Sequence, residues 1–281
     1  MRTISRETIV EAVAELCKKA ACKLPQDVYG AIKRASNNES SPIGQSILKS
    51  LIENADIAQS ENVPICQDTG VAVYFVEIGT EIDLSHLDIY EAITEGTTKG
   101  YVEGYLRLSI AKDPLQDRSN SKTNGPPIIH IKLVPGDKLK ITLAPKGGGS
   151  ENMSRLAMLK PLVGKKGIVD FVLETMRLAG GNPCPPCVIG VGLGGNFEVA
   201  PYLAKKALLR EIGQRHPNPY YAQFELELLE AVNSLGIGPS GLGGKNTALD
   251  VHIETYPCHI ASLPVAVNLN CHAARHASIE L

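Results

Sequence analysis

A short polar stretch, PICQDTG at residues 64–70, places several chemically active side chains next to one another. The thiol of Cys66 is followed at once by the amide of Gln67, the carboxylate of Asp68 and the hydroxyl of Thr69. A thiolate can bind a metal or act as a nucleophile, and a neighbouring carboxylate can move a proton. Asp-Thr-Gly is also typical of a tight turn in which the aspartate bonds its own backbone. Taken alone, the stretch is therefore compatible with a metal or catalytic site and with a structural turn.

A second group of thiols, Cys184 and Cys187, forms a C-x-x-C pattern in NPCPPCVIG. A redox pair needs its first thiol at a helix N-terminus, which lowers the thiol pKa. The residues that follow, VIGVGLGG, predict a strand and a glycine loop instead, so redox chemistry loses its main support. A structural zinc site needs four ligands, and the tail CHAARH offers Cys271, His272 and His276. A zinc-structured binding module and a C-x-x-C redox protein remain the alternatives at this point.

Three glycine-rich loops offer backbone amides that could approach an anion. GVGLGG at 190–195 fits G-x-G-x-x-G, but no acidic residue ends a second strand about 20 residues later, which weakens a dinucleotide interpretation. GPSGLGGKNT at 238–247 lacks the first glycine and the Ser or Thr of a phosphate-binding loop. KGGGSEN at 146–152 sets three bare amides beside a lysine. Because three such loops occur in one chain, we favour a carboxylate ligand over a flexible turn for this last loop.

These residues must be positioned by a mixture of helices and strands. Apolar spacing predicts helices at about 5–21, 25–36, 43–59, 88–107, 164–179, 198–212 and 220–235. Alternating or β-branched runs predict strands at 71–79, 127–134, 138–144, 187–195, 248–256 and 264–270. The turn sequence PGDK predicts that the strands 127–134 and 138–144 form a hairpin. The pattern indicates a mixed α+β variant of the α/β class: a helical N-terminal segment, then irregular sheets and helices, not a doubly wound Rossmann sheet.

The composition excludes several classes of protein. The formal net charge is −2 and the basic residues are scattered, so we expect no nucleic-acid partner. No apolar run is long enough to cross a bilayer, and the N-terminus lacks the apolar core of a signal peptide, so we expect a cytoplasmic protein without a membrane partner. The seven cysteines are odd in number and widely spread, which argues against a disulfide framework. Cys17 and Cys22 lie on an apolar helix, where we expect buried core thiols.

Five segments follow one another along the chain: PICQDTG, YLRLS, KGGGSEN, CPPCVIGVGLGG and LDVHIETYPCHIASLPVAVNLNCHAARH. Together they resemble the alpha subunit of the class I, iron-sulfur dependent fumarate hydratases, and the alpha subunit of L-tartrate dehydratase shares the pattern. The resemblance runs from about residue 5 to the C-terminus. It implies one catalytic domain over residues 1–281, with a helical part at about 1–60 and a cluster and substrate-binding part at about 61–281.

The resemblance also implies a cofactor. In that family three separated cysteines bind one [4Fe-4S] cluster, and the matching positions are Cys66, Cys184 and Cys271. Cys187 and Cys258 fall outside this ligand pattern. A cluster held by three thiolates leaves one iron open to an oxygen ligand, which suits hydration and dehydration chemistry without net electron transfer.

The substrate contacts carried over from the family lie in the same segments. Asp68 and His259 match catalytic positions, as a proton donor or acceptor and as a donor or proton relay. The matching substrate-binding positions are Gln67, Arg107, Gly148 and Gly149. Lys146, Asn152 and His252 are weaker candidates.

The same resemblance suggests a reaction and a partner. We expect reversible hydration of fumarate to (S)-malate, with L-tartrate or a related dicarboxylate as the alternative substrate. The catalytic C-terminal domain of single-chain relatives has no counterpart after Leu281, so we expect an obligate beta subunit and an α2β2 assembly. Around DRSNSKTNGPPIIH the chain departs from the family run but keeps Arg118, Asn120 and Asn124.

Overall fold

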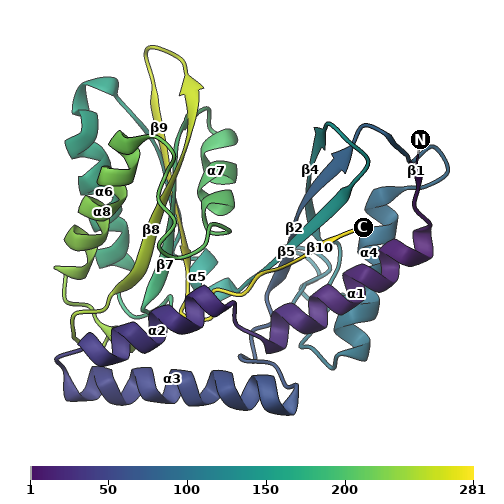
Figure 1. The fold of residues 1–281 in the computed structure, drawn as a ribbon. Helices are drawn as coiled ribbons and strands as arrows, with labels where there is room; N and C mark the ends of the chain where they lie inside the picture. The colour runs from purple at the N-terminus through teal and green to yellow at the C-terminus, as the bar shows by residue number, and fades with distance from the viewer. Residues whose placement is uncertain (1) are drawn as a thin grey trace. The chain divides into compact units, whose positions relative to one another are not determined.

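The structure is a computed structural model that describes residues 2–281. It confirms the predicted mixed α/β class, with helices and small mixed sheets along the whole chain (Figure 1). The helices are α1 (Arg6–Cys22), α2 (Gln26–Asn38), α3 (Pro42–Glu61), α4 (Ile89–Glu103), α5 (Gly148–Glu151), α6 (Gly164–Ala179), α7 (Val199–Ala207) and α8 (Pro219–Asn233), with short 3-10 turns η1 (Pro161–Val163) and η2 (Pro239–Gly241). The strands are β1 (Arg2–Thr3), β2 (Val71–Gly79), β3 (Ile82–Asp83), β4 (Ile128–Val134), β5 (Leu139–Lys146), β6 (Arg155–Leu159), β7 (Cys187–Gly195), β8 (Ala248–Cys258), β9 (Leu263–Asn270) and β10 (Ala277–Glu280).

The contacts divide the chain into two compact units. Unit 1 comprises the residues up to Pro25, Ala55–Gly148 and Arg275–Leu281, and unit 2 comprises Gln26–Asn54 and Gly149–Ala274. This division rests on contacts alone, and the single catalytic domain over residues 1–281 stays a prediction.

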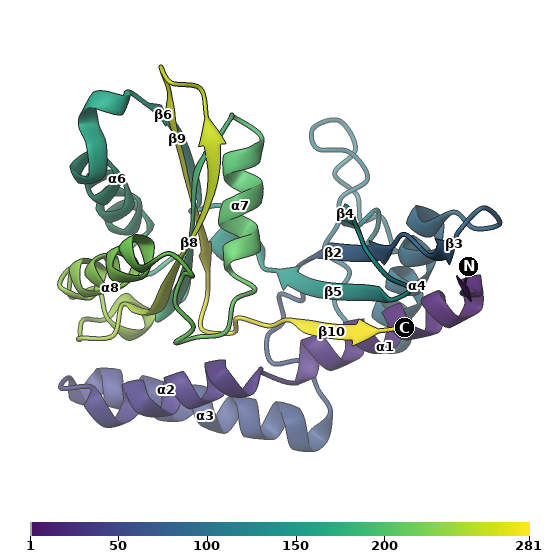
Figure 2. The ribbon, with the colours of Figure 1, turned by 45° about the horizontal axis from the view of Figure 1, so that its top comes forward.

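Unit 1 is built on a sheet with the strand order β10-β5-β2-β4, and β1 pairs with β3 (Figure 2). Helices α1 and α4 pack together beside this sheet, and their apolar faces share one core with the buried Tyr74 of β2. Ser5 accepts a hydrogen bond from the Thr8 N–H, so it caps α1 as its residue type predicts. The core of unit 1 therefore combines the predicted N-terminal helix with strands from the middle of the chain.

The predicted hairpin of strands 127–134 and 138–144 is wrong. β2 lies between them, parallel to β4 and antiparallel to β5. β2 is the more deeply buried strand and takes the central place, whereas β4 is largely exposed at the sheet edge. The PGDK turn passes over the end of β2, where the Gly79 N–H donates to Lys138 O and the Thr80 N–H donates to Val134 O.

Unit 2 is built on a second sheet, with the order β6-β9-β7-β8. Helices α6 and α8 cover one face of this sheet and α7 covers the other (Figure 1). A Cβ atom on Gly190 or Gly192 would lie 2.0 Å from a backbone oxygen of α7, Ala204 O or Ala200 O. The glycines of GVGLGG therefore allow close packing of a helix on a strand, which explains this motif without a nucleotide.

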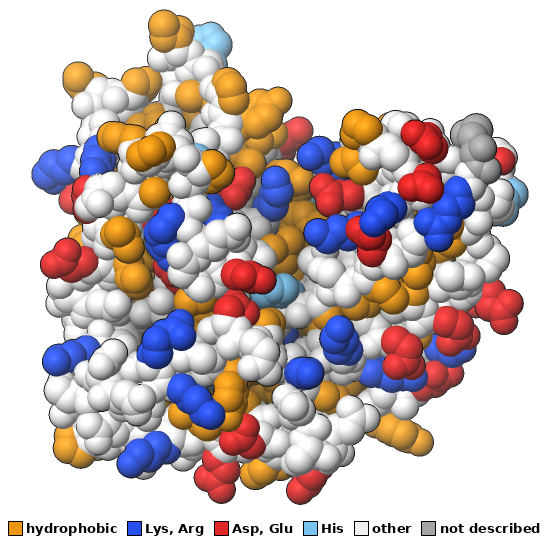
Figure 3. Space-filling model, viewed as in Figure 1, with side chains coloured by type: hydrophobic (Ala, Val, Ile, Leu, Met, Phe, Trp, Pro, Cys, Tyr) orange, Lys and Arg blue, Asp and Glu red, His pale blue; other side chains and the backbone are white. Residues whose placement is uncertain are grey.

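The charged side chains are interspersed on the face shown in Figure 3, where basic and acidic groups alternate and neither sign forms a continuous patch. This agrees with the nearly balanced composition of the chain. None of the helices in the described part of the chain combines the length and the apolar content that a membrane span requires.

Candidate active site

The Cys66 loop lies in unit 1, directly before β2. Cys66 is partly exposed, and its Sγ accepts a hydrogen bond from the Asp68 N–H at 3.4 Å. Gly70 ends the loop with a φ of +78°, and a Cβ atom there would lie 2.7 Å from the Lys146 backbone. Only glycine fits this conformation and this approach without strain. The pairing of Val71 with Lys146 thus brings the Cys66 loop against the KGGG loop.

Asp68 uses both carboxylate oxygens within unit 1. Its Oδ1 accepts from the Gly70 N–H at 3.1 Å, and its Oδ2 accepts from the Gly148 N–H at 2.8 Å. The first bond is the aspartate turn that the sequence allowed, and the second shows that the glycine loop binds a carboxylate. The acceptor is the chain's own aspartate, so the predicted contact of Gly148 with a substrate stays a prediction.

Arg107 lies beside the same loop. Its backbone oxygen accepts from the Thr69 Oγ1 at 2.6 Å, and its side chain is exposed. No salt bridge of Arg107 occurs among residues 2–281. Gln67 is exposed as well. Unit 1 therefore brings together Cys66, Gln67, Asp68, Arg107 and Gly148.

Three buried polar side chains that the sequence did not single out for this role hold the loop in place. The Tyr101 hydroxyl donates to Thr69 O at 3.0 Å, and the Asn124 Nδ2 donates to Gly70 O at 3.1 Å. The Arg275 Nη2 donates to Asp68 O at 2.7 Å. The stretch DRSNSKTNG departs from the family pattern but keeps Asn124, and this was the one sequence feature that pointed to a role in the site. No local sequence pattern indicated such a role for Tyr101 or Arg275.

Cys184 and Cys271 lie at one end of the unit 2 sheet. β7 begins just after Cys184 and β9 ends just before Cys271, and these neighbouring strands are antiparallel, with Val188 opposite Asn270. His272 joins the two segments, because its backbone N–H and its Nδ1 both donate to Cys184 O, at 3.3 and 3.0 Å. The antiparallel pairing thus places two of the predicted ligands in adjacent loops.

The Cys184 loop has further supports within unit 2. A Cβ atom on Gly149 would lie 3.4 Å from Asn182 O, so this glycine packs against the backbone before Cys184. The Ser240 N–H donates to Pro185 O at 2.8 Å. Ser240 belongs to the glycine-rich loop GPSGLGGKNT, which thereby has a positioning role in place of phosphate binding.

Glu39 fastens that glycine-rich loop to the end of α2. Its buried carboxylate accepts hydrogen bonds from the backbone N–H groups of Ser40, Ser41, Lys245 and Asn246 and from the Asn246 side chain. Burial would raise the pKa of Glu39, but these donors outweigh it and lower the pKa to about 2. These hydrogen bonds, which we call the Glu39 clasp, therefore require the ionised form of the Glu39 carboxylate.

His259 lies at the opposite end of the unit 2 sheet from Cys184. It follows β8, whose last residue Cys258 pairs with Gly195, whereas Cys187 pairs with Ala248 at the other end. β7 has 9 residues, and at about 3.3 Å per residue it separates the two ends by about 26 Å. His259 also lines a cavity of about 400 Å³ together with Lys165, Leu193 and Tyr256. The fold thus does not bring His259 to the Cys184 end of the sheet.

Cys187 and His252 have structural surroundings. Cys187 is fully buried in the apolar core of unit 2, and the C-x-x-C pattern leads into β7 rather than a helix. The strand that follows removes the helix N-terminus that the redox alternative requires, and the described residues hold no group of three ligands that would support the zinc alternative. No disulfide links any of the seven cysteines, all of which lie in the described residues.

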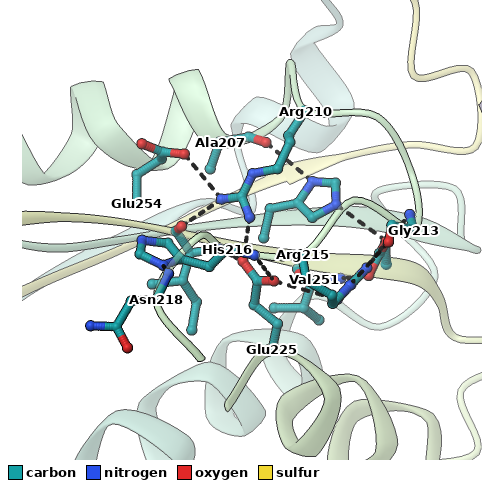
Figure 4. A network of polar contacts seen from close by, with 12 residues as sticks. Ala207, Arg210, Gly213, Arg215, His216, Asn218, Glu225, Val251 and Glu254 are labelled. Carbon is teal, nitrogen blue, oxygen red and sulfur yellow. Dashed lines mark hydrogen bonds and ion pairs between the residues drawn. The ribbon is translucent and has the colours of Figure 1, made fainter. Parts of the chain in front are cut away.

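A buried polar network surrounds the loop that follows α7 (Figure 4), and the hydrogen bonds of His252 make it part of this network. Its Nδ1 contacts Ala207 O and its Nε2 contacts Asp250 Oδ2, both at 3.2 Å. Burial raises the pKa of Asp250, but His252 and Arg215 outweigh it and hold the pKa at about 2. Glu225, with no exposed surface, accepts from Arg210 and lies 3.6 Å from Arg215. The network stabilises the fold of unit 2 and explains His252 without catalysis.

Throughout residues 2–281, no three His, Cys, Asp or Glu side chains lie close enough together to hold a metal ion. Cys66 belongs to unit 1, whereas Cys184 and Cys271 belong to unit 2. The shared three-cysteine site therefore stays a prediction.

Comparison with known families decides the class of protein. The family described as fumarate hydratase (Fumerase) matches residues 10–280, nearly the whole chain. The chain belongs to the fumarate hydratase family. The predicted resemblance to the alpha subunits of this family and of L-tartrate dehydratases is confirmed, and so is the prediction of a hydro-lyase enzyme.

Individual members of the fumarate hydratase family are similar over their whole length. A Methanocaldococcus jannaschii protein, provisionally named L(+)-tartrate dehydratase subunit alpha, is 50% identical over 275 residues, which cover 96% of each chain. The L(+)-tartrate dehydratase subunit alpha of Escherichia coli strain UTI89 is 34% identical over 277 residues, covering 97% of this chain and 90% of the relative. The corresponding protein of strain K12 is 34% identical over 275 residues.

The residues of this fumarate hydratase family member fit an iron-sulfur cluster chemically. Cys66 and Cys271 are partly exposed and Cys184 is exposed, each in a loop, so their thiolates are accessible as ligands. The Nε and Nη1 atoms of Arg275, beside the Cys66 loop, are buried without a hydrogen-bond partner. An orphaned buried cation at this position suits an anionic group.

Proposed function

We propose that this chain is the alpha subunit of a two-subunit hydro-lyase that reversibly hydrates fumarate to (S)-malate. The observation that carries this proposal is the family match over residues 10–280. In this proposal Cys66, Cys184 and Cys271 hold a [4Fe-4S] cluster. When bound, the cluster would supply a Lewis-acidic iron that has no cysteine ligand.

The chain's own residues would bind and orient the dicarboxylate. Arg107 has an exposed guanidinium without a salt bridge, and such a planar fork binds a carboxylate through two parallel hydrogen bonds. The Gly148 N–H already donates to a carboxylate, that of Asp68, which supports a role for the KGGG loop, including Gly149, in carboxylate binding. The exposed amide of Gln67 would donate a further hydrogen bond.

Proton transfer is assigned to Asp68, which lies next to the first cysteine. His259 lies about 26 Å along the 9-residue strand β7 from the Cys184 end of its own sheet. His259 therefore keeps its proposed role only if it serves the site of another alpha chain, as the expected α2β2 assembly would allow.

The second candidate reaction is dehydration of L-tartrate. The names of the relatives favour this reaction, because the M. jannaschii and E. coli proteins are both named as the alpha subunit of L(+)-tartrate dehydratase. The same names support a beta subunit as the partner of this chain. In an apolar pocket one hydroxyl of the substrate is worth only about 1–3 kcal/mol of affinity, so a small change in pocket shape would be enough to switch the substrate.

The test is anaerobic co-expression with the neighbouring beta-subunit gene, followed by kcat/KM measurements with fumarate and with L-tartrate. We expect activity from the two-chain enzyme, little or none from this chain alone, and loss of activity in air. A higher kcat/KM for L-tartrate would assign the second reaction. A two-chain complex that carries a full cluster but converts neither substrate would contradict both candidate reactions.

A further inference from the structure

Arg275 is the only fully buried arginine among residues 2–281, with 2% of the residue exposed. It lies four positions after Cys271, just before β10. Its Nη2 donates to Asp68 O at 2.7 Å, and the N–H of the same Asp68 donates to Cys66 Sγ at 3.4 Å. The guanidinium is thus separated from the Cys66 thiol by one residue of backbone.

The other two nitrogens of this guanidinium, Nε and Nη1, have no hydrogen-bond partner among residues 2–281. Nε and Nη1 are buried without a hydrogen bond, and no carboxylate within the described residues pairs with Arg275. Arg210, by contrast, binds Glu225 and Glu254, and Arg215 binds Asp250. A buried unpaired cation is costly, so a fold that keeps one is expected to offer it an anion in another state.

Three groups of unit 1 that lie near Arg275 do not serve as this anion: Cys22, Tyr101 and Asp68. The nearby thiol of Cys22 has its pKa raised by burial, which Arg275 only partly offsets, and the pKa of the buried Tyr101 hydroxyl is raised as well. Both groups are therefore neutral near pH 7. The Asp68 carboxylate already accepts from the amides of Gly70 and Gly148.

We propose that Arg275 is a positioning residue of the cluster site, whose two unpaired nitrogens, Nε and Nη1, would donate hydrogen bonds toward the thiolate-bound cluster and compensate its negative charge. The inference rests on the proposed function, since it requires a cluster at Cys66. Thiolate and sulfide sulfurs accept hydrogen bonds, and such bonds tune and retain iron-sulfur clusters. Arg275 would thereby link the position of the Cys66 loop to the presence of the cluster.

The test compares Arg275→Met with Arg210→Met in the full chain, free of cluster and after anaerobic reconstitution. In the reconstituted Arg275→Met chain, iron release to a chelator should be about 10- to 100-fold faster than in the wild type. Without cluster, its melting temperature should fall by much less than that of Arg210→Met, because removal of an uncompensated buried charge offsets the loss of the hydrogen bond to Asp68 O. Arg210→Met should lower the melting temperature on the order of 10 °C in both forms, because it removes the ion pair at 2.6 Å and leaves the buried Glu225 carboxylate with Arg215 at 3.6 Å as its only cationic partner among the described residues.

A conservative variant keeps the inference falsifiable. Arg275→Lys retains the charge and should release iron at a rate between those of the wild type and Arg275→Met. Wild-type iron release from Arg275→Met would overturn the inference, as would a fall in its cluster-free melting temperature as large as that of Arg210→Met. A wild-type chain that takes up no iron contradicts the proposed function itself and overturns this inference with it, which distinguishes the two failures.

Discussion

At the scale of single residues, the Asp68 carboxylate holds two backbone amides and is also the proposed proton-transfer group. Its two oxygens hold the amides of Gly70 and Gly148, and protonation would weaken both hydrogen bonds. A proton-transfer role would therefore be coupled to movement of the glycine loop, whereas a positioning role needs no movement. The structure strengthens the turn interpretation of PICQDTG without removing the catalytic one.

Asp68→Asn separates these two roles. If Asp68 transfers a proton, turnover should fall by about 100-fold or more while the cluster absorbance stays unchanged. The free energy of unfolding should fall by about 1–3 kcal/mol in either case, because a charged acceptor of Gly148 is lost. Asp117→Asn, in an exposed turn with Ser119, is the control for replacing a turn aspartate. Unchanged turnover in the Asp68 variant would rule out proton transfer.

Residue-level prediction succeeded where the function lies in short local patterns. The carboxylate-binding glycine loop and the turn at Asp68 could be inferred from local sequence. The roles of Tyr101 and Arg275 could not, and that of Asn124 was indicated only by the family resemblance, because each reaches its partner from another part of unit 1. A buried side-chain hydrogen bond between distant segments has no sequence periodicity to reveal it.

At the scale of elements, strong periodicity predicted most helices and strands to within a few residues. The strands 71–79 and 187–195 and the helix 164–179 have the predicted bounds. β6 and β10 were missed because each is short and pairs at an edge of its sheet. The order of strands in unit 1 was mispredicted because a turn sequence indicates chain reversal but not which strand fills the space between.

The Glu39 clasp predicts a pH-dependent stability. The pKa of Glu39 is lowered from 4.5 to about 2, so its ionised form contributes stability above pH 4.5 that is lost as the pH falls toward 2. Glu39→Gln should lower the free energy of unfolding on the order of 3 kcal/mol at pH 7 and by much less near pH 2. Urea unfolding over this pH range measures it, with the exposed Glu53→Gln as control. An effect that does not change with pH would contradict the clasp.

The buried network of Figure 4 predicts a contrast between two glutamates on α8. Glu225 has no exposed side-chain surface and pairs with Arg210, whereas Glu227 pairs with Lys165 at 42% exposure. Glu225→Gln removes the fully buried carboxylate that pairs with Arg210 and leaves Arg210 with only the partly exposed Glu254, so we expect a loss of about 3 kcal/mol of unfolding free energy. Glu227→Gln should cost at most about 1 kcal/mol. Equal losses in chemical denaturation would show that the network does not stabilise unit 2.

At the scale of the whole molecule, the chain is a hydro-lyase of the fumarate hydratase family whose two units each carry part of the predicted site. Unit 1 holds Cys66 with Asp68 and Arg107, and unit 2 holds Cys184 with Cys271. The protein family and the type of enzyme could be predicted from the order of short motifs along the chain. The placement of His259 could not, because it depends on the direction of the strand that carries it.

The central claim, that three separated cysteines hold one iron-sulfur cluster, is tested most directly by iron content after anaerobic reconstitution. The wild-type chain should bind about four irons and show cluster absorbance. Cys66→Ser, Cys184→Ser and Cys271→Ser should each lose the full cluster, whereas Cys187→Ser and Cys258→Ser should retain it. A full cluster in any one of the first three variants, or its loss in the other two, would contradict the ligand assignment.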